Sequence, residues 1–409
     1  MGVTKKQQLG GDLSRLRQLN AQAVVGVLRG ESSLTLTEIS RRTGLSRAST
    51  EDVVRELAAD GWVAEVAPAT GTVGRPARRF SFRADGGRVL GVDVGTHKIR
   101  AIVADLDGNL RGTQHVTVTP TMGRVERLTA LDEAIDKCLA VAQVRGADIW
   151  ATGVATPGLV DGSGQVRACE ALPEWVGVNL AGHVGRQVRG RVLVENDCRL
   201  AALAEWWRGA ARYADNIVFV LAGPHIGTGL IINGRLHHGS ANAAGEIGAL
   251  PAIGWIRAQE HLQHWMADSD HRNPDDGALE TVSGEVFAAA RAGEAGAQLA
   301  VEQYVRDLGI GVAALILTLD PQLVVLGGGF SRSADVFLEP LRRELGRWCV
   351  RTPELLVSSL GDEGVAFGAV RLALDHIEEE GLDTRRSSGT GPLRRSRQLQ
   401  SRAARNRQS

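Results

Sequence analysis

The sequence has few cysteines, no long apolar run and no net charge, and each shortage excludes a class of protein. Four cysteines are scattered among 409 residues without a Cys-x-x-Cys pair, which argues against a disulfide framework or a Cys-rich zinc site. The longest apolar runs, such as 312–319, are too short to span a bilayer. The N-terminus continues into polar residues, so we expect no signal peptide, no membrane partner and a cytoplasmic location.

Charge is balanced over the whole chain but is distributed unevenly along it. Residues 1–85 carry 13 Lys/Arg against 9 Asp/Glu, and residues 381–409 carry 8 Arg against one Asp. Two basic ends around an acidic middle favour contact between the ends and an anionic polymer. Residues 381–409 also lack apolar periodicity, which predicts a disordered basic tail. The tail either adds non-specific affinity for DNA or has no role.

The first 85 residues follow the pattern of a winged helix-turn-helix DNA-binding domain. Thr35 and Glu38 form a capping box that begins a second helix, Gly44 makes the turn, and Ser46 can cap a third helix. Two short strands around a Gly/Pro loop then form the wing. The expected helices include residues 16–28, 35–39 and 46–57, and the expected strands are 62–66 and 80–82.

The third helix and the wing carry the candidate DNA contacts. Arg47, Ser49 and Thr50 lie in the first turn of the third helix, where short polar groups and an arginine can reach base edges in the major groove. Arg75 and Arg78 lie in the wing, where they suit phosphates or a narrow minor groove. The alternative is that these helices form a small partner-binding bundle with a solvated basic face.

Residues 86–380 are predicted to form an α/β body of two lobes with a cleft between them. A strand–strand–strand–helix–strand order recurs in the two halves, and comparable halves favour two packed lobes. We place lobe one at about 86–197 plus 364–380, and lobe two at about 198–363. The expected strands are 89–95, 99–106, 114–118, 150–154, 217–221, 228–232 and 323–326, with helices over 125–144 and before 323.

A series of short motifs in a fixed order resembles the ROK family (repressors, open reading frames and kinases). The resemblance covers nearly the whole chain except the tail, and it implies the actin-like ATPase fold of sugar kinases behind the winged head. The motifs are Gly74-Arg75-Pro76, Gly91-Val92-Asp93-Val94-Gly95, Thr156-Pro157-Gly158, Glu195-Asn196-Asp197, Gly245-Glu246-Ile247-Gly248, Gly277-Ala278-Leu279-Glu280, Leu319-Asp320-Pro321 and Gly327-Gly328-Gly329.

The resemblance also implies a sugar site. In kinases of the family, the position that matches Asp197 is the general base, and those that match Asn196, Glu246 and Glu280 hydrogen-bond the sugar. A buried sugar hydroxyl needs a partner, and carboxylates are strong acceptors. The alternative is that Asp197 caps the following helix and that the two glutamates are ordinary surface residues.

Departures from the kinase pattern lie in the two phosphate loops. Thr96 and His97 stand where the family has Gly and Thr, and Pro224 and His225 interrupt the second loop. Proline has no N–H to offer a phosphate, so we expect no ATP turnover and no cofactor.

The zinc site of the family is also missing from the sequence. Ala249 replaces the histidine that serves both the zinc ion and the sugar. His261 and His264 are expected on a solvated helix face rather than as ligands, so we expect no metal.

These features predict a sugar-responsive transcriptional regulator, a repressor of genes for carbohydrate uptake or catabolism. Its expected partners are operator DNA and a sugar or sugar phosphate, and a homodimer or homotetramer would read a pseudo-palindromic operator. Two alternatives remain. One is an ATP-dependent sugar kinase with an attached regulatory head, and the other is a constitutive DNA-binding protein whose pocket binds nothing.

Overall fold

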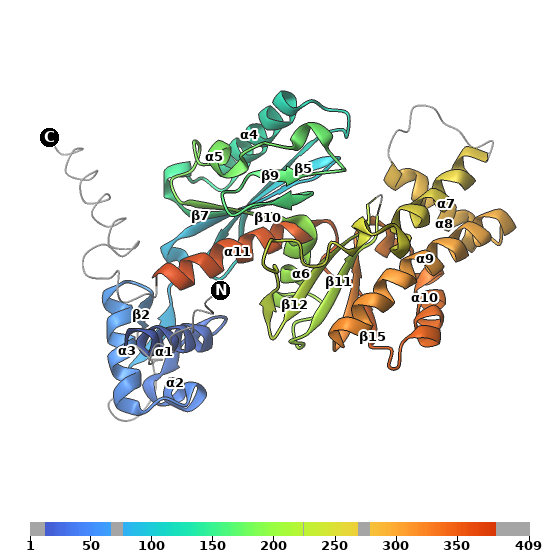
Figure 1. The fold of residues 1–409 in the computed structure, drawn as a ribbon. Coiled ribbons are helices and arrows are strands. Elements are labelled where there is room, and N and C mark those ends of the chain that lie inside the picture. The colour runs from blue at the N-terminus through green and yellow to red at the C-terminus, as the bar shows by residue number, and fades with distance from the viewer. Residues whose placement is uncertain (1–12, 67–76, 224, 269–278, 382–409) are drawn as a thin grey trace, which may run out of the picture.

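The chain forms a small N-terminal head and a larger body with two sheets (Figure 1). The computed structural model describes residues 13–66, 77–223, 225–268 and 279–381. The head is a winged helix-turn-helix and the body has the two-sheet α/β organisation of the kinase-like fold, which confirms the predicted fold class. Among the described residues, no helix is long and apolar enough to cross a bilayer.

In its described residues, 13–66 and 77–85, the head contains three helices and a three-stranded sheet in the order β1-β3-β2. The predicted capping box is present at Thr35 and Glu38, and the Ser46 hydroxyl accepts from the Ser49 N–H to begin the third helix. Gly44 has φ 71°, the left-handed conformation that ends the second helix. The elements are α1 Leu13–Leu28, β1 Leu34–Thr35, α2 Leu36–Thr43, α3 Arg47–Ala59, β2 Val63–Val66 and β3 Arg79–Phe82.

The apolar core of the head continues into the body. Trp62, which is almost fully buried after α3, meets Trp150 of the body edge-to-face with ring centroids 6.2 Å apart. One cluster of buried apolar side chains includes head residues such as Leu28 together with Ile102 and Val370 of the body. Shared apolar burial of this kind opposes independent movement of the head.

Lobe one of the body is built on a five-stranded mixed sheet in the order β10-β7-β4-β5-β6. The edge strand β10 and its neighbours β7 and β4 are parallel, so their carboxyl ends lie on the same side of the sheet. The strand β10 and the short elements before it were missing from the sequence-based prediction. The elements are β4 Arg88–Val94, β5 Lys98–Asp105, β6 Leu110–Thr117, α4 Arg124–Val141, β7 Ile149–Thr156, β8 Leu159–Val160, β9 Val166–Ala168, α5 Leu180–Val184 and β10 Arg191–Asn196.

Lobe two has a second five-stranded sheet, in the order β13-β12-β11-β14-β15, with a group of helices on one side (Figure 1). Asn233 and Gly234 both have positive φ in the turn between β12 and β13, as the predicted Asn-Gly hairpin requires. The elements are β11 Ile217–Leu221, β12 Gly227–Ile232, β13 Arg235–Leu236, α7 Trp255–Asp268, α8 Leu279–Arg291, α9 Ala295–Leu319, β14 Leu323–Gly327, α10 Ala334–Trp348 and β15 Glu354–Val357.

Two helices, α6 (Asp197–Trp207) and α11 (Gly364–Gly381), join the lobes and pack against each other. Their backbones come so close that a Cβ atom on Gly368 would lie 1.8 Å from the Leu200 carbonyl oxygen. Figure 1 shows α11 running from beside α6 to the head, so the last helix of the body ends next to α1.

Candidate functional site

The expected sugar-binding residues begin where β10 ends and α6 begins. The Asn196 side chain caps α6, since its Oδ1 accepts from the Arg199 N–H at 3.2 Å, and its Nδ2 donates to the Gly158 carbonyl oxygen at 3.0 Å. The motifs at 156–158 and 195–197 are therefore adjacent in space. Because Asn196 is the N-cap, the alternative role that we considered for Asp197 is taken by its neighbour.

A buried arginine that we had not singled out organises this site. Arg199 is 1% exposed, and its Nη1 donates to Glu195 Oε1 at 3.0 Å. Its Nη2 donates to the Asn242 carbonyl oxygen at 2.6 Å and lies 3.9 Å from Glu246 Oε1. One guanidinium thus holds the end of β10 to the loop that carries Glu246. The spacing of Glu195 and Arg199, four residues apart at a helix start, was the signal available in the sequence.

Glu195 has a second partner, which the sequence analysis also missed. His238 Nε2 lies 2.8 Å from Glu195 Oε2, and the Asn196 N–H donates to the other carboxylate oxygen at 2.8 Å. Burial raises the pKa of Glu195, but the hydrogen bonds from His238 and Asn196 and the charge of Arg199 oppose it, so the pKa is lowered overall. Glu195 is consequently a structural anion rather than a free acceptor for a ligand.

Glu246 and Asp197 differ from Glu195, because both carboxyls keep a raised pKa. The Glu246 side chain is about half exposed at 48%, and its pKa is raised by desolvation and by Glu170 and Glu195. Burial raises the pKa of Asp197 to about 6, and Glu246 adds to the shift. Carboxyls whose pKa values are raised by burial and by nearby carboxylates are typical of ligand and catalytic sites.

Asp93, at the end of β4, belongs to the same group of carboxyls. Burial raises its pKa to about 7, and the charge of Asp197 adds to the shift. Glu280 is the second residue of α8, but its side chain lies outside what the structure describes. The structure therefore brings Asn196, Asp197 and Glu246 to one place, and it does not report on Glu280.

The first of the two loops that depart from the kinase pattern is a tight turn held by the protein. The Gly95 N–H donates to the Lys98 carbonyl oxygen at 2.9 Å, and the buried Arg127 donates to the Gly95 carbonyl oxygen at 2.9 Å. In the second loop, His225 is described and exposed, whereas Pro224 lies outside the described residues. Although the residue is exposed overall, nearby protein atoms partly desolvate the imidazole and lower the pKa of His225, against the charge of Glu170.

The head places only part of the expected DNA-contacting set on its surface. Arg47 is exposed and Ser49 half-buried at the start of α3. Thr50 does not project outward as we expected, because it is fully buried and its hydroxyl donates to the Ser46 carbonyl oxygen at 2.9 Å. We therefore remove Thr50 from the candidate contacts.

In the wing, Arg78 makes a bidentate contact with Glu65, with its Nε and Nη2 2.8 and 2.6 Å from the carboxylate oxygens. A DNA phosphate would have to compete with Glu65 for this guanidinium. The second wing candidate, Arg75, lies outside the described residues.

The histidines of α7 have protein partners or face solvent. His261 Nε2 lies 3.1 Å from Asp307 Oδ2, on a carboxylate that Arg257 also holds, and His264 is exposed. Ala249, at the position of the family's zinc histidine, is exposed in a short 3-10 helix. Within the described residues, no group of three or more His, Cys, Asp or Glu side chains could hold a metal ion.

Comparison with known proteins identifies the families that the head and the body resemble. Residues 89–376 match the ROK family, and residues 21–67 match the IclR helix-turn-helix domain. The chain belongs to the ROK family. A xylose repressor of Caldicellulosiruptor bescii is 24% identical to it over 392 residues, which cover 90% of this chain and 98% of the relative.

Two further proteins match different lengths of the chain. A glucokinase of Streptomyces coelicolor is 28% identical over 319 residues, covering 70% of this chain and 98% of the enzyme. The crystal structure of a ROK family transcriptional regulator, a homolog of the E. coli MLC protein, superposes with a TM-score of 0.72 at 20% identity, covering 90% and 99% of the two chains. This last likeness shows the fold.

Proposed function

We propose that this chain is a sugar-responsive transcriptional repressor, in which the body binds a sugar or sugar phosphate and the head binds operator DNA. The observation that carries the proposal is the position of Asn196, Asp197 and Glu246 in a body whose apolar core continues into a helix-turn-helix head. A ligand that favours one shape of the cleft can therefore also favour one placement of the head.

The relatives support the same assignment of DNA binding to the head and sugar binding to the body. The match to the xylose repressor covers 90% of this chain, whereas the match to the glucokinase covers 70%, which is about the share of the chain that the body takes. We assign DNA binding to residues 1–85, sugar binding to residues 86–380 and no specific contact to the tail, 381–409. A pentose or hexose is the effector class, and D-xylose is the first sugar to test. The regulated genes are those of carbohydrate uptake or catabolism.

The body is proposed to work without phosphoryl transfer. Phosphate loops present backbone N–H groups to the nucleotide, but Pro224 has none and the Gly95 N–H already donates to the Lys98 carbonyl oxygen. Asp197 then serves as an acceptor for a sugar hydroxyl rather than as a catalytic base. We further propose that the protein acts in the cytoplasm as a homodimer or homotetramer on a pseudo-palindromic operator.

The test measures operator affinity in the presence of sugars. Operator DNA is selected from a randomised duplex pool with the full chain, and its Kd is measured by fluorescence anisotropy with monosaccharides and their phosphates. We expect at least one sugar to change the Kd; a panel in which none does would contradict the proposal. A coupled ADP-release assay with D-xylose and D-glucose separates the kinase alternative, since turnover that Asp197→Asn abolishes would establish an enzyme.

A further inference from the structure

Helix α6 connects the candidate sugar site to the head. Its first residue is Asp197 of the candidate sugar site, and its last residue, Trp207, is followed by Arg208 where the body meets the head. Eleven residues of α-helix span about 16 Å. Because a short packed helix moves as a unit, a displacement at Asp197 reaches the other end of α6.

The far end of α6 is clamped to the turn between β5 and β6. Arg208 Nη1 donates to the Gly108 carbonyl oxygen at 2.8 Å, and its Nη2 donates to the Asp107 carbonyl oxygen at 2.5 Å. The same guanidinium stacks on the Trp207 ring, 3.8 Å from its centroid. Gly108 has φ 76°, and a Cβ atom on it would lie 2.3 Å from the Trp207 ring. Any residue larger than glycine at position 108 would therefore clash with the end of the helix.

The other side of this turn faces the head. Arg29, at the end of α1, lies 3.7 Å from Asp107 Oδ1 and donates to Glu378 of α11 at 2.5 Å. Glu378 also pairs with Arg371 at 3.4 Å, and Arg371 lies over the Trp207 ring, 5.6 Å from its centroid. These contacts close a ring of side chains that starts and ends at α6.

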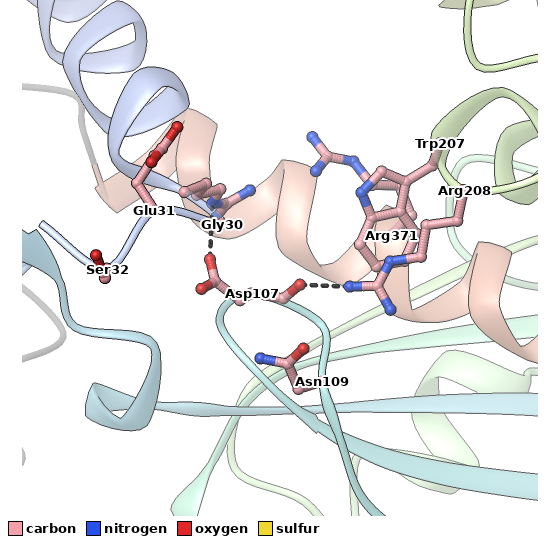
Figure 2. Close-up of a pocket in the computed structure, with 9 residues that line it drawn as sticks. Gly30, Glu31, Ser32, Asp107, Asn109, Trp207, Arg208 and Arg371 are labelled. Atoms are coloured by element: carbon pink, nitrogen blue, oxygen red, sulfur yellow. Dashed lines mark hydrogen bonds and ion pairs between the residues drawn. The ribbon is translucent and has the colours of Figure 1, made fainter.

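This junction ring consists of Arg29, Asp107, Trp207, Arg208, Arg371 and Glu378. All of its residues except Glu378 line a pocket of about 600 Å³. Figure 2 shows Asp107 between the Gly30–Glu31 segment of the head and Arg208 of the body. Arg29 Nε and Asp107 Oδ1 are buried and face each other at 3.7 Å, beyond hydrogen-bond distance, and the buried Arg371 Nε has no hydrogen bond within the described residues. A second arrangement of the ring could therefore give these atoms the hydrogen bonds that they lack here.

We propose that the junction ring transmits the state of the sugar site to the DNA-binding head, with Arg208 as the positioning residue that couples α6 to Asp107 and Arg29. The inference rests on the proposed function, because it names how that function is regulated. It requires that the two placements of the head differ in the contacts that Arg208 makes. Lysine cannot replace arginine here, because only the planar guanidinium reaches two carbonyl oxygens while it stacks on an indole.

The experiment compares full-length wild type with Arg208→Ala, Arg208→Lys and Arg29→Ala, which breaks the ring from the head side. Arg212→Ala is the matched control, since Arg212 is exposed four residues further along and contacts only the Tyr213 ring in the described contacts. Calorimetry with D-xylose and D-glucose gives sugar affinity, and anisotropy gives operator Kd with and without each sugar. The response is the ratio of the operator Kd with sugar to the operator Kd without sugar. Coupling between two sites commonly changes an affinity by about 5- to 150-fold.

In Arg208→Ala and Arg29→Ala, we expect the operator Kd with sugar to lie within about two-fold of the operator Kd without sugar. The affinity for sugar and the affinity for operator in the absence of sugar should both stay close to wild type. Arg208→Lys should retain only part of the response, and Arg212→Ala all of it. If Arg208→Ala and Arg29→Ala keep the wild-type ratio, or if they lose sugar binding itself, the coupling role of the junction ring is overturned and the proposed function still stands. A wild type that binds operator but responds to neither sugar would overturn the proposed effector class together with it.

Discussion

Arg199 Nη1 lies 3.0 Å from Glu195 Oε1, and this pair is buried at the point where the two lobes meet. The arginine is 1% exposed, and the same guanidinium donates to the carbonyl oxygen of Asn242. A buried ion pair of this kind contributes little net stability as a pair, but removal of one partner leaves the other charge without compensation. The pair therefore serves the geometry of the site more than the stability of the fold.

The first prediction concerns this pair. Arg199→Met should lower the free energy of unfolding by about 3–5 kcal/mol, because Glu195 would stay buried without its cation. The double variant Arg199→Met, Glu195→Gln should recover part of that loss. Urea denaturation measures both, and Arg342→Met, an exposed arginine of α10, is the control. Equal losses in the single and double variants would contradict the coupling.

A second prediction follows from the pKa of Asp93, which burial raises to about 7. The unfolded carboxyl titrates near pH 4, so the folded chain binds one more proton between about pH 4 and about pH 7. The contribution of this group to the free energy of unfolding must then fall as pH rises through that window. Urea unfolding at about pH 5 and about pH 8 should show a smaller decrease for Asp93→Asn than for wild type. The same decrease in both proteins would rule out Asp93 as the source.

The third prediction is that sugar binding requires the Asp197 carboxylate, whose pKa burial raises to about 6. Affinity for an effector sugar should fall about tenfold between about pH 7 and about pH 5, as the acceptor becomes protonated. Asp197→Asn should weaken binding at about pH 7, where the wild-type group is ionised, and remove this dependence. Calorimetry checks both, with Asp136→Asn on the exposed face of α4 as the control. A pH-dependent affinity in Asp197→Asn would assign the titration to another group.

The sequence predicted the parts of this fold that local chemistry determines. The capping box at Thr35, the left-handed Gly44 and the Asn233-Gly234 turn each depend on a few neighbouring residues, and all are present. The buried pairing of β10 with β7 and the closure of the junction ring depend on residues far apart in the chain. No spacing rule brings Arg29 beside Glu378, 349 positions away.

In the candidate site, too, the sequence did not predict the contacts that depend on tertiary packing. Family motifs placed Asn196, Asp197 and Glu246, but the buried partner Arg199 was visible only as a pair spaced by one helical turn. Thr50 was expected on the surface from its position in the first turn of α3, yet that turn also packs on the head's own core. The apolar periodicity of a sequence predicts less reliably which side chains are buried in the first and last turns of a helix, because capping hydrogen bonds and packing also determine their positions there.

The fourth prediction tests whether head and body unfold together. Trp150→Ala removes the edge-to-face contact with Trp62 and should cost about 3 kcal/mol. The loss should also split thermal unfolding into two transitions, because the shared core would be interrupted. Trp348→Ala, on the partly exposed face of α10, should leave a single transition in the same calorimetric scan. A single transition in Trp150→Ala would show that the remaining apolar contacts suffice.

The fifth prediction concerns DNA reading by α3. Arg47 is exposed at the amino-terminal end of the helix, where a guanidinium can reach a guanine edge, so Arg47→Ala should weaken operator binding by about 1–3 kcal/mol. Arg55→Ala, on the same helix but two turns further and paired with Asp52, should change affinity much less. Anisotropy with the operator and with a scrambled duplex separates a base contact from a phosphate contact, because only the first lowers the specificity ratio. An unchanged ratio with uniformly weaker binding would place Arg47 on the DNA backbone instead.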